Sequence, residues 1–193
     1  MAATKRVAVV SSSTRPTRIC PGIAAWIHQA LRDLPAPDEP TPLEYELLDL
    51  ADVDLPFLDE PLMPALGQYA HEHTKAWSRL VDQYDGFLFV LPQYNWGYPA
   101  VLKNALDFLY REWNNKAAGF VSYGGAGGAR AVEHLRLVMS ELMVATVRAQ
   151  VMLSLITDFE KFTTFKPLPQ REAELATVLD QVVSWARALK MVR

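Results

Sequence analysis

The apolar run at residues 86–91, GFLFVL, constrains the fold of this chain more than any other segment. A strand without polar alternation is buried on both faces, and such strands are typical of parallel sheets covered by helices on each side. Similar short runs recur along the chain, separated by segments whose apolar residues follow helical spacing. The pattern therefore predicts strands and helices alternating around one parallel sheet.

The predicted elements form two sets. Strands are expected at residues 6–10, 43–50, 86–91, 117–123 and 151–156, with residues 144–147 as another candidate for part of the fifth. Helices are expected at residues 19–34, 68–84, 99–109, 130–143 and 170–190. Right-handed crossovers leave two doubly wound solutions, and five strands favour the order 2-1-3-4-5 over the six-stranded dinucleotide-binding order. The predicted fold class is α/β, a three-layer α/β/α sandwich with a five-stranded parallel sheet.

The composition fits a single domain spanning residues 1–193. Of the 193 residues, 50% are hydrophobic and 21% are charged, so the chain can bury a substantial core. Its net charge of −3 argues against a nucleic-acid partner, and no window reaches the roughly 18 apolar residues of a membrane span. With no leader evident, we expect a cytoplasmic protein. Clustered prolines predict loops at residues 35–42 and 56–67.

In the order 2-1-3-4-5, the loops that follow strands one, three and four must meet at one edge of the sheet. The first loop is SSSTRPTR, residues 11–18. Its hydroxyls, its helix N-terminus and its two arginines, Arg15 and Arg18, suit an anion such as phosphate. A serine-rich turn that merely caps the helix is the alternative. Capping needs one hydroxyl, and the sequence shows no carboxylate nearby, so we favour the anion site.

The second loop is PQYNWGY, residues 92–98. The rings of Tyr94, Trp96 and Tyr98 offer stacking area, and the amides of Gln93 and Asn95 offer directional hydrogen bonds. Together they suit a flat ring with polar edges. The alternative is a structural turn whose aromatic side chains fold into the core.

The third loop is SYGGAGGAR, residues 122–130. Its four glycines allow the backbone to approach a ligand closely. It lacks the G-x-G-x-x-G spacing and follows the fourth strand, so it is weak as a dinucleotide fingerprint. A tight turn without a ligand remains an equal alternative for this loop taken alone.

The three loops resemble motifs of the NADPH-dependent FMN reductase family, whose fold is flavodoxin-like. That family has a G-S-x-R-x-x-R-like phosphate loop, a P-E-Y-N segment running into L-K-N-A-L-D, and a glycine-rich turn after the fourth strand. The counterparts here are residues 12–18 (SSTRPTR), 92–95 (PQYN) with 102–107 (LKNALD), and 122–125 (SYGG). The middle motif is quite specific, the outer two are supportive, and the likeness spans residues 6–156.

The resemblance implies an FMN site made by all three loops. Ser13, Arg15 and Arg18 would hold the phosphate, with Ser11 and Ser12 as helpers. Pro92, Gln93, Tyr94, Asn95 and Trp96 would line one side of the isoalloxazine, and Ser122, Tyr123, Gly124 and Gly125 would line its pyrimidine edge. The sequence departs from the family pattern twice. Ser12 replaces a common glycine and could crowd the phosphate turn, and Gln93 replaces a common glutamate and removes a negative charge near the ring.

The resemblance also implies an activity. FMN would take a hydride from NADPH or NADH at N5 and pass electrons to a small-molecule acceptor such as a flavin, quinone, azo compound or metal oxyanion, by a ping-pong cycle. No catalytic side chain and no metal are expected, and family members are often homodimers or homotetramers. The alternatives are an electron-transfer flavodoxin, disfavoured by the modest net charge and the two arginines, and a flavin-binding or cofactor-free sensor without turnover.

Three other residues, His71, His73 and Cys20, are given no role in the site, and the role of Arg130 stays open. His71 and His73 stand two apart in a predicted helix, so they should not share a face or bind a metal. Cys20, the single cysteine, excludes an intrachain disulfide and is expected to be a small buried residue. Arg130 could meet the 2′-phosphate of NADPH or form a surface salt bridge, and the sequence does not separate these two interpretations.

Overall fold

The computed structural model describes residues 5–33 and 43–193, so the proline-rich segment at residues 35–42 lies outside the described residues. Five parallel strands form one sheet in the order β2-β1-β3-β4-β5, which confirms the predicted fold class and strand order. The strands are β1 (Lys5–Ser11), β2 (Leu43–Asp49), β3 (Gly86–Pro92), β4 (Ala117–Gly124) and β5 (Ala145–Ser154).

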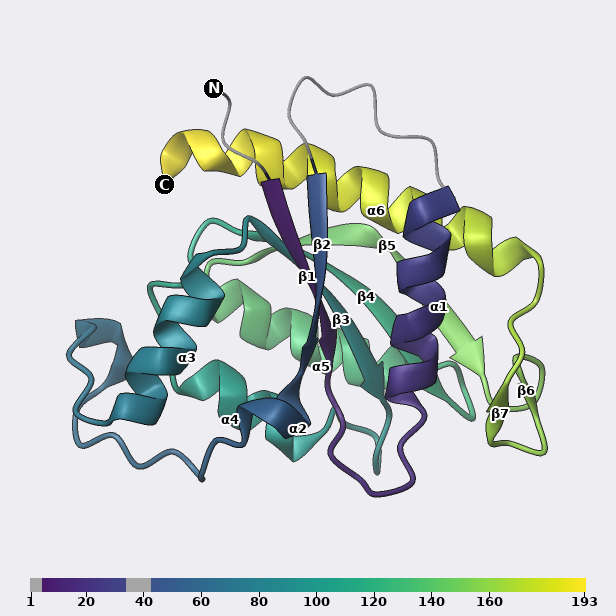
Figure 1. Ribbon diagram of the computed structural model, residues 1–193, viewed down its shortest axis with the longest axis horizontal. Helices are drawn as coiled ribbons and strands as arrows, with labels where there is room; N and C mark the ends of the chain where they lie inside the picture. Colours follow the sequence, from purple (N-terminus) through teal and green to yellow (C-terminus); the bar gives the residue numbers. More distant parts are fainter. Residues whose placement is uncertain (1–4, 34–42) are drawn as a thin grey trace.

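Helices cover both faces of the sheet (Figure 1). The long helices are α1 (Cys20–Asp33), α3 (Glu72–Asp82), α4 (Ala100–Asp107), α5 (Ala129–Glu141) and α6 (Gln170–Leu189), and the short ones are α2 (Leu50–Val53), η1 (Pro64–Leu66) and η2 (Lys190–Val192). Alternate residues of a strand point to opposite faces. Accordingly Val7 and Val9 pack in the core with α1 and α6, whereas Ala8 and Val10 pack in the core with α3, α4 and α5.

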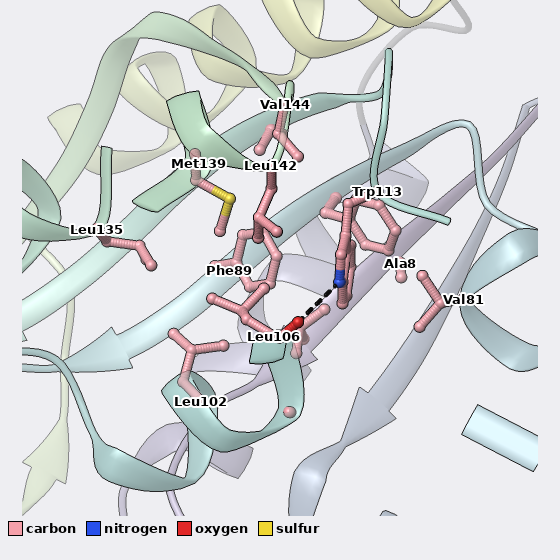
Figure 2. Close-up of a cluster of buried hydrophobic side chains, with 14 of the residues drawn as sticks. Ala8, Val81, Phe89, Leu102, Leu106, Trp113, Leu135, Met139, Leu142 and Val144 are labelled. Atoms are coloured by element: carbon pink, nitrogen blue, oxygen red, sulfur yellow. Dashed lines mark hydrogen bonds between the residues drawn. The ribbon is translucent and has the colours of Figure 1, made fainter. Parts of the chain in front are cut away.

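The core beneath α4 fixes the position of the loop that precedes this helix. Trp113 is 2% exposed, and its ring centroid lies 5.0 Å from that of Phe87 on β3. Its indole N–H donates to the carbonyl of Leu106 in α4 (3.2 Å), the dashed line in Figure 2. Because α4 is bonded to this buried ring, residues 92–98 are held at both ends by the core.

The structure differs from the sequence-based elements in several places, among them the short helices α2 and η1, which were not predicted. β5 is a single strand that takes in most of both candidate segments, residues 145–147 and 151–154, with a register shift against β4 between Ala118 and Phe120. α3 begins later than predicted because the Glu60 carboxylate accepts the N–H groups of Ala70 and His71 and holds them outside the helix. α4 ends before residue 109. A short antiparallel hairpin, β6 (Phe159–Glu160) and β7 (Thr164–Phe165), was not predicted.

Candidate functional site

Hydrogen bonds join the three loops at the carboxyl edge of the sheet. The backbone N–H of Ser12 donates to the carbonyl of Val90 (3.0 Å), and that of Gln93 donates to the carbonyl of Tyr123 (2.9 Å). The Ser13 hydroxyl lies 2.8 Å from the Tyr94 phenolic oxygen. In Figure 1 the loop after β1 lies at the lower edge of the sheet, beside the segment between β3 and α4. The convergence expected from strand order is therefore confirmed.

The first loop has a buried base and an exposed tip. Ser11, Ser12 and Ser13 are at most 1% exposed, whereas Arg15 is exposed. The guanidinium carbon of Arg15 lies 6.0 Å from the centroid of the Tyr94 ring, so this cation leans toward the second loop. The first turn of α1 contains no acidic residue, which leaves the positive end of the helix dipole uncompensated.

The expectation that no carboxylate lies near the first loop is wrong, because the Asp49 carboxylate contacts Arg18. Arg18 Nη2 lies 3.0 Å from Asp49 Oδ2, and this bond raises the pKa of the guanidinium. Asp49 ends β2, which pairs with β1, so neighbouring strands bring the two side chains together. Arg18 Nε is buried with no partner among the described residues, so one donor remains for a ligand.

The second loop is a tight turn with a left-handed backbone. Tyr94 and Gly97 exchange both backbone hydrogen bonds at 2.9 Å, and the two residues between them, Asn95 and Trp96, have φ of 46° and 78°. Positive φ at both central positions is the geometry of a type I′ turn, which normally selects Asn-Gly. A tryptophan at the second position costs about 1 kcal/mol or more. Trp96 is nevertheless 59% exposed, so the alternative of aromatics folded into the core is wrong for this residue.

The third loop uses glycine where no other residue fits. Gly127 and Gly128 have φ of 65° and 76°, and a Cβ on Gly128 would lie 2.7 Å from Ser122 Cβ. The Ser122 hydroxyl donates to the carbonyl of Gly127 (2.7 Å), which closes the turn. Gly125 is exposed, and a Cβ there would meet no atom within 4 Å. The open part of the loop is therefore at Gly125.

Tyr123 and Cys20 lie in the core behind the loops. The Tyr123 hydroxyl and the Cys20 sulfur are 3.0 Å apart, and both residues are buried, which confirms the expectation of a buried Cys20. Burial raises the pKa of both the Cys20 thiol and the Tyr123 phenol. Both groups are therefore protonated at neutral pH, and neither supplies a thiolate or phenolate base.

The residues present fit FMN. The Ser11 hydroxyl and the Gln93 Oε1 oxygen are buried without a partner among the described residues, and a bound ligand with donors and acceptors would satisfy them. Arg15 and the N-terminus of α1 supply positive charge at one end of the site. At the other end, the exposed rings of Tyr94 and Trp96 and the open backbone at Gly125 suit a flat heterocycle.

Residues 5–33 and 43–193 were also compared with the requirements of a metal site and of a membrane-spanning helix. No group of three or more His, Cys, Asp and Glu side chains in this part of the chain is placed to hold a metal ion. The His71 and His73 rings do stack, with centroids 5.2 Å apart, because His71 precedes α3 in extended conformation rather than lying within the helix. Among the same residues, no helix is long and apolar enough to cross a membrane.

Sequence comparison identifies the family. The profile of the NADPH-dependent FMN reductase family matches residues 5–158. The chain belongs to this family. It is 43% identical over 157 residues to an NAD(P)H-dependent FMN reductase of Schizosaccharomyces pombe, covering 80% of this chain and 76% of that protein. It is 39% identical over 148 residues to the NAD(P)H-dependent FMN reductase LOT6 of Saccharomyces cerevisiae, covering 74% and 77%.

A solved structure supports the fold. The flavoenzyme NAD(P)H:(acceptor) oxidoreductase FerB from Paracoccus denitrificans superposes with a TM-score of 0.71 at 21% identity, covering 96% of this chain and 98% of FerB. The flavodoxin-like architecture is thereby confirmed. Family membership also confirms the predicted enzyme class, an NAD(P)H-dependent oxidoreductase of the FMN reductase type, and its cofactors, FMN with a nicotinamide nucleotide as co-substrate.

Two residues of the site region were missed or left undecided by the sequence. Asp49 was overlooked, although the strand order 2-1-3-4-5 places the end of the second strand beside the first loop. The sequence left two interpretations of Arg130 open, and the structure shows a contact that neither of them included. Its guanidinium carbon lies 3.9 Å from the centroid of the Trp96 ring.

Proposed function

We propose that the protein is a single-domain, cytoplasmic FMN-dependent oxidoreductase that is reduced by NAD(P)H and then reduces a small-molecule acceptor in a ping-pong cycle. The observation that carries this proposal is the 2.8 Å contact between Ser13 and Tyr94, which joins an anion-binding loop to an aromatic turn. When bound, FMN supplies the redox chemistry by accepting a hydride at N5 and releasing electrons to the second substrate.

The first loop and Arg15 bind the phosphate in this proposal. Arg15 is exposed, and the hydrogen bond that its guanidinium donates within the described part of the chain, to the Thr17 carbonyl, is long at 3.5 Å, so the guanidinium can turn toward a phosphate at little cost. The serines at positions 11–13 and the N-terminus of α1 add hydroxyl and backbone donors. Arg18 contributes its unpartnered Nε while Asp49 holds the rest of the guanidinium.

The second and third loops orient the ring. Pro92, Gln93, Tyr94, Asn95 and Trp96 line one side of the isoalloxazine, and Ser122, Tyr123, Gly124 and Gly125 border its pyrimidine edge, Tyr123 through its main chain. Gln93 Oε1, buried and without a partner, is placed to accept a hydrogen bond from an N–H of the ring. Because Cys20 and Tyr123 are protonated and bonded to each other, the protein positions substrates rather than moving protons.

The acceptor is a flat molecule in this proposal, namely a flavin, a quinone, an azo compound or a similar oxidant. The exposed rings of Tyr94 (36%) and Trp96 (59%) support this assignment, because they present stacking surface to solvent at the rim of the site. No polar pocket specific for one acceptor is needed to use such a surface.

The active form is a homodimer or homotetramer in this proposal. Large apolar side chains are exposed on the segment between α2 and α3, with Phe57 at 84% and Met63 at 68%. Asn104 fastens this segment, donating to the Pro56 carbonyl (2.7 Å) and accepting from the Leu58 N–H (3.0 Å). A fixed apolar segment of this kind suits contact with a second copy. Light scattering should show that Phe57→Ser combined with Met63→Ser shifts the protein to monomers.

An anaerobic absorbance spectrum with added FMN, recorded before and after NADPH, tests the proposed function. Perturbed flavin bands that bleach on NADPH addition, followed by reoxidation with a quinone, support it. Perturbed bands that stay oxidised would instead indicate an electron carrier or sensor. An unperturbed flavin spectrum would remove the FMN site assigned to the three loops.

A further inference from the structure

Arg130 and Trp96 form a stacked pair at the rim of the site. The guanidinium carbon lies 3.9 Å from the indole centroid, which is contact distance for a cation over an aromatic face. Trp96 comes from the left-handed turn of the second loop, and Arg130 comes from the first turn of α5, directly after the glycine-rich turn. The pair thus bridges two of the three loops.

The positive charge of Arg130 has no carboxylate partner in the described part of the chain. No acidic residue lies in the first turn of α5, and its N-cap, Gly128, provides no side-chain cap. The helix dipole therefore adds to the positive potential at this end of α5. The Arg130 guanidinium is half-buried, has no anionic partner among the described residues, and lies at a helix N-terminus beside an exposed ring. This arrangement is suited to an anionic aromatic ligand.

The FMN phosphate is an unsuitable ligand for Arg130. The turn of the second loop carries two arginine–aromatic pairs, Arg15 over Tyr94 at 6.0 Å and Arg130 over Trp96 at 3.9 Å. Arg15 belongs to the loop proposed to hold the FMN phosphate, whereas Arg130 belongs to the loop proposed to border the ring. An anion at Arg130 is therefore carried by a second molecule, and the co-substrate of this family is a phosphorylated nucleotide.

We propose that Trp96 and Arg130 bind the 2′-phosphoadenosine part of NADPH, and that Arg130 discriminates NADPH from NADH. A guanidinium lying on an indole keeps its edge N–H groups available for a phosphate, while its outer face can stack on a purine. The 2′-phosphate is the group by which the two nucleotides differ. This inference rests on the proposed function and adds the residue that sets its nucleotide preference.

Calorimetric titration of the FMN-loaded protein with two probes tests the inference without turnover. The probes are adenosine 2′,5′-bisphosphate and adenosine 5′-monophosphate. Arg130→Ala should weaken bisphosphate binding about 10- to 100-fold, as expected for a charged hydrogen bond, and change monophosphate binding far less. In steady-state kinetics the same variant should raise KM for NADPH, while KM for NADH stays within about twofold.

Three further variants sharpen the test. Arg130→Lys keeps the charge but loses the planar fork, so it should recover only part of the bisphosphate affinity. Trp96→Leu should weaken both probes about fivefold or more, because the guanidinium loses the indole face that holds its plane in position to stack on the purine. Arg79→Ala removes an exposed positive charge on α3, away from the three loops, and should leave the ratio between the two probes unchanged.

Several outcomes would overturn the inference. Equal losses for both probes, or none, would show that Arg130 does not recognise the 2′-phosphate. Loss of FMN from Arg130→Ala would assign Arg130 to the cofactor instead. If wild-type protein reduces its FMN with NADPH and Arg130→Ala keeps the nucleotide preference, the inference fails while the proposed function stands.

Discussion

The Ser13 hydroxyl lies 2.8 Å from the Tyr94 phenolic oxygen, although 81 residues separate the two in the sequence. Ser13 is 1% exposed and Tyr94 is 36% exposed, so the contact runs from the buried base of the first loop to the rim of the second. It exists because β1 and β3 are neighbours, with Ser11 aligned to Val90. The bond therefore arranges the proposed phosphate and ring ends of the site before a ligand arrives.

Removing either hydroxyl should loosen this arrangement. We expect Ser13→Ala and Tyr94→Phe each to weaken FMN binding about 2- to 10-fold, the range of one neutral hydrogen bond. The double variant should bind little worse than Ser13→Ala, because Tyr94→Phe removes only the hydrogen bond that Ser13→Ala has already removed. Fluorescence titration of FMN into the four proteins gives the coupling. Additive losses would show that the two hydroxyls act on the ligand independently.

Substitution of the two arginines of the first loop should affect thermal stability differently. Arg15→Ala should weaken FMN binding about tenfold and leave the thermal midpoint unchanged, because Arg15 is exposed and the side-chain hydrogen bond that it makes to a described residue is long. Arg18→Ala should also lower the thermal midpoint, because it leaves Asp49 at the end of β2 without its partner. Flavin titration and calorimetry on both variants check this. Equal thermal shifts would contradict the assignment.

Sequence patterning predicted the sheet because its signals are local. A strand such as β3, buried at every position, needs no knowledge of its neighbours to be recognised, and strand alternation with helices then restricts the topology. The convergence of the three loops followed from topology alone. Family resemblance added the cofactor, which no spacing of residues in this chain specifies.

The features that escaped prediction depend on contacts between distant segments. Asp49 reaches Arg18 through strand pairing, and Glu60 delays the start of α3 by binding backbone N–H groups ten and eleven residues away. The left-handed backbone of Trp96 escaped prediction because a tryptophan is a poor signal for a type I′ turn. Such a residue is retained where surrounding structure and function require it.

The glycine-rich loop offers a matched pair of substitutions. A Cβ at Gly128 would lie 2.7 Å from Ser122 Cβ on a backbone with φ of 76°, whereas a Cβ at Gly125 would meet no atom within 4 Å. Gly128→Ala should therefore lower the free energy of unfolding by about 2 kcal/mol or more. Gly125→Ala should leave it nearly unchanged. Urea unfolding of both variants provides the measurement, and equal stabilities would contradict the assigned packing of the loop.

Lys116 lies at the end of the sheet opposite the site and should make stability depend on alkaline pH. It is 3% exposed, and its ammonium donates to the carbonyls of Val81 (2.9 Å) and Asp82 (3.3 Å) at the end of α3. Burial lowers the pKa of Lys116 to about 8, whereas the unfolded chain keeps the ordinary value of 10.5. Between these values the unfolded state binds more protons, so the free energy of unfolding rises with pH.

Lys116 contributes a rise of about 2 kcal/mol from about pH 7.5 to about pH 9.5. The buried Cys20 thiol offsets part of this rise near pH 9 and above, because the unfolded thiol ionises at its ordinary pKa of 9.0 while burial raises the pKa in the folded chain. Higher pH reverses the trend, because burial raises the pKa of Tyr45 and Tyr84 to about 12 and their ionisation then favours the unfolded chain. Lys116→Met removes the titrating group, and Lys116→Arg keeps a charge throughout this range, so both variants should lose the rise. Denaturant unfolding of the three proteins at each pH measures it. A rise of equal size in Lys116→Met would assign the pH dependence to other groups.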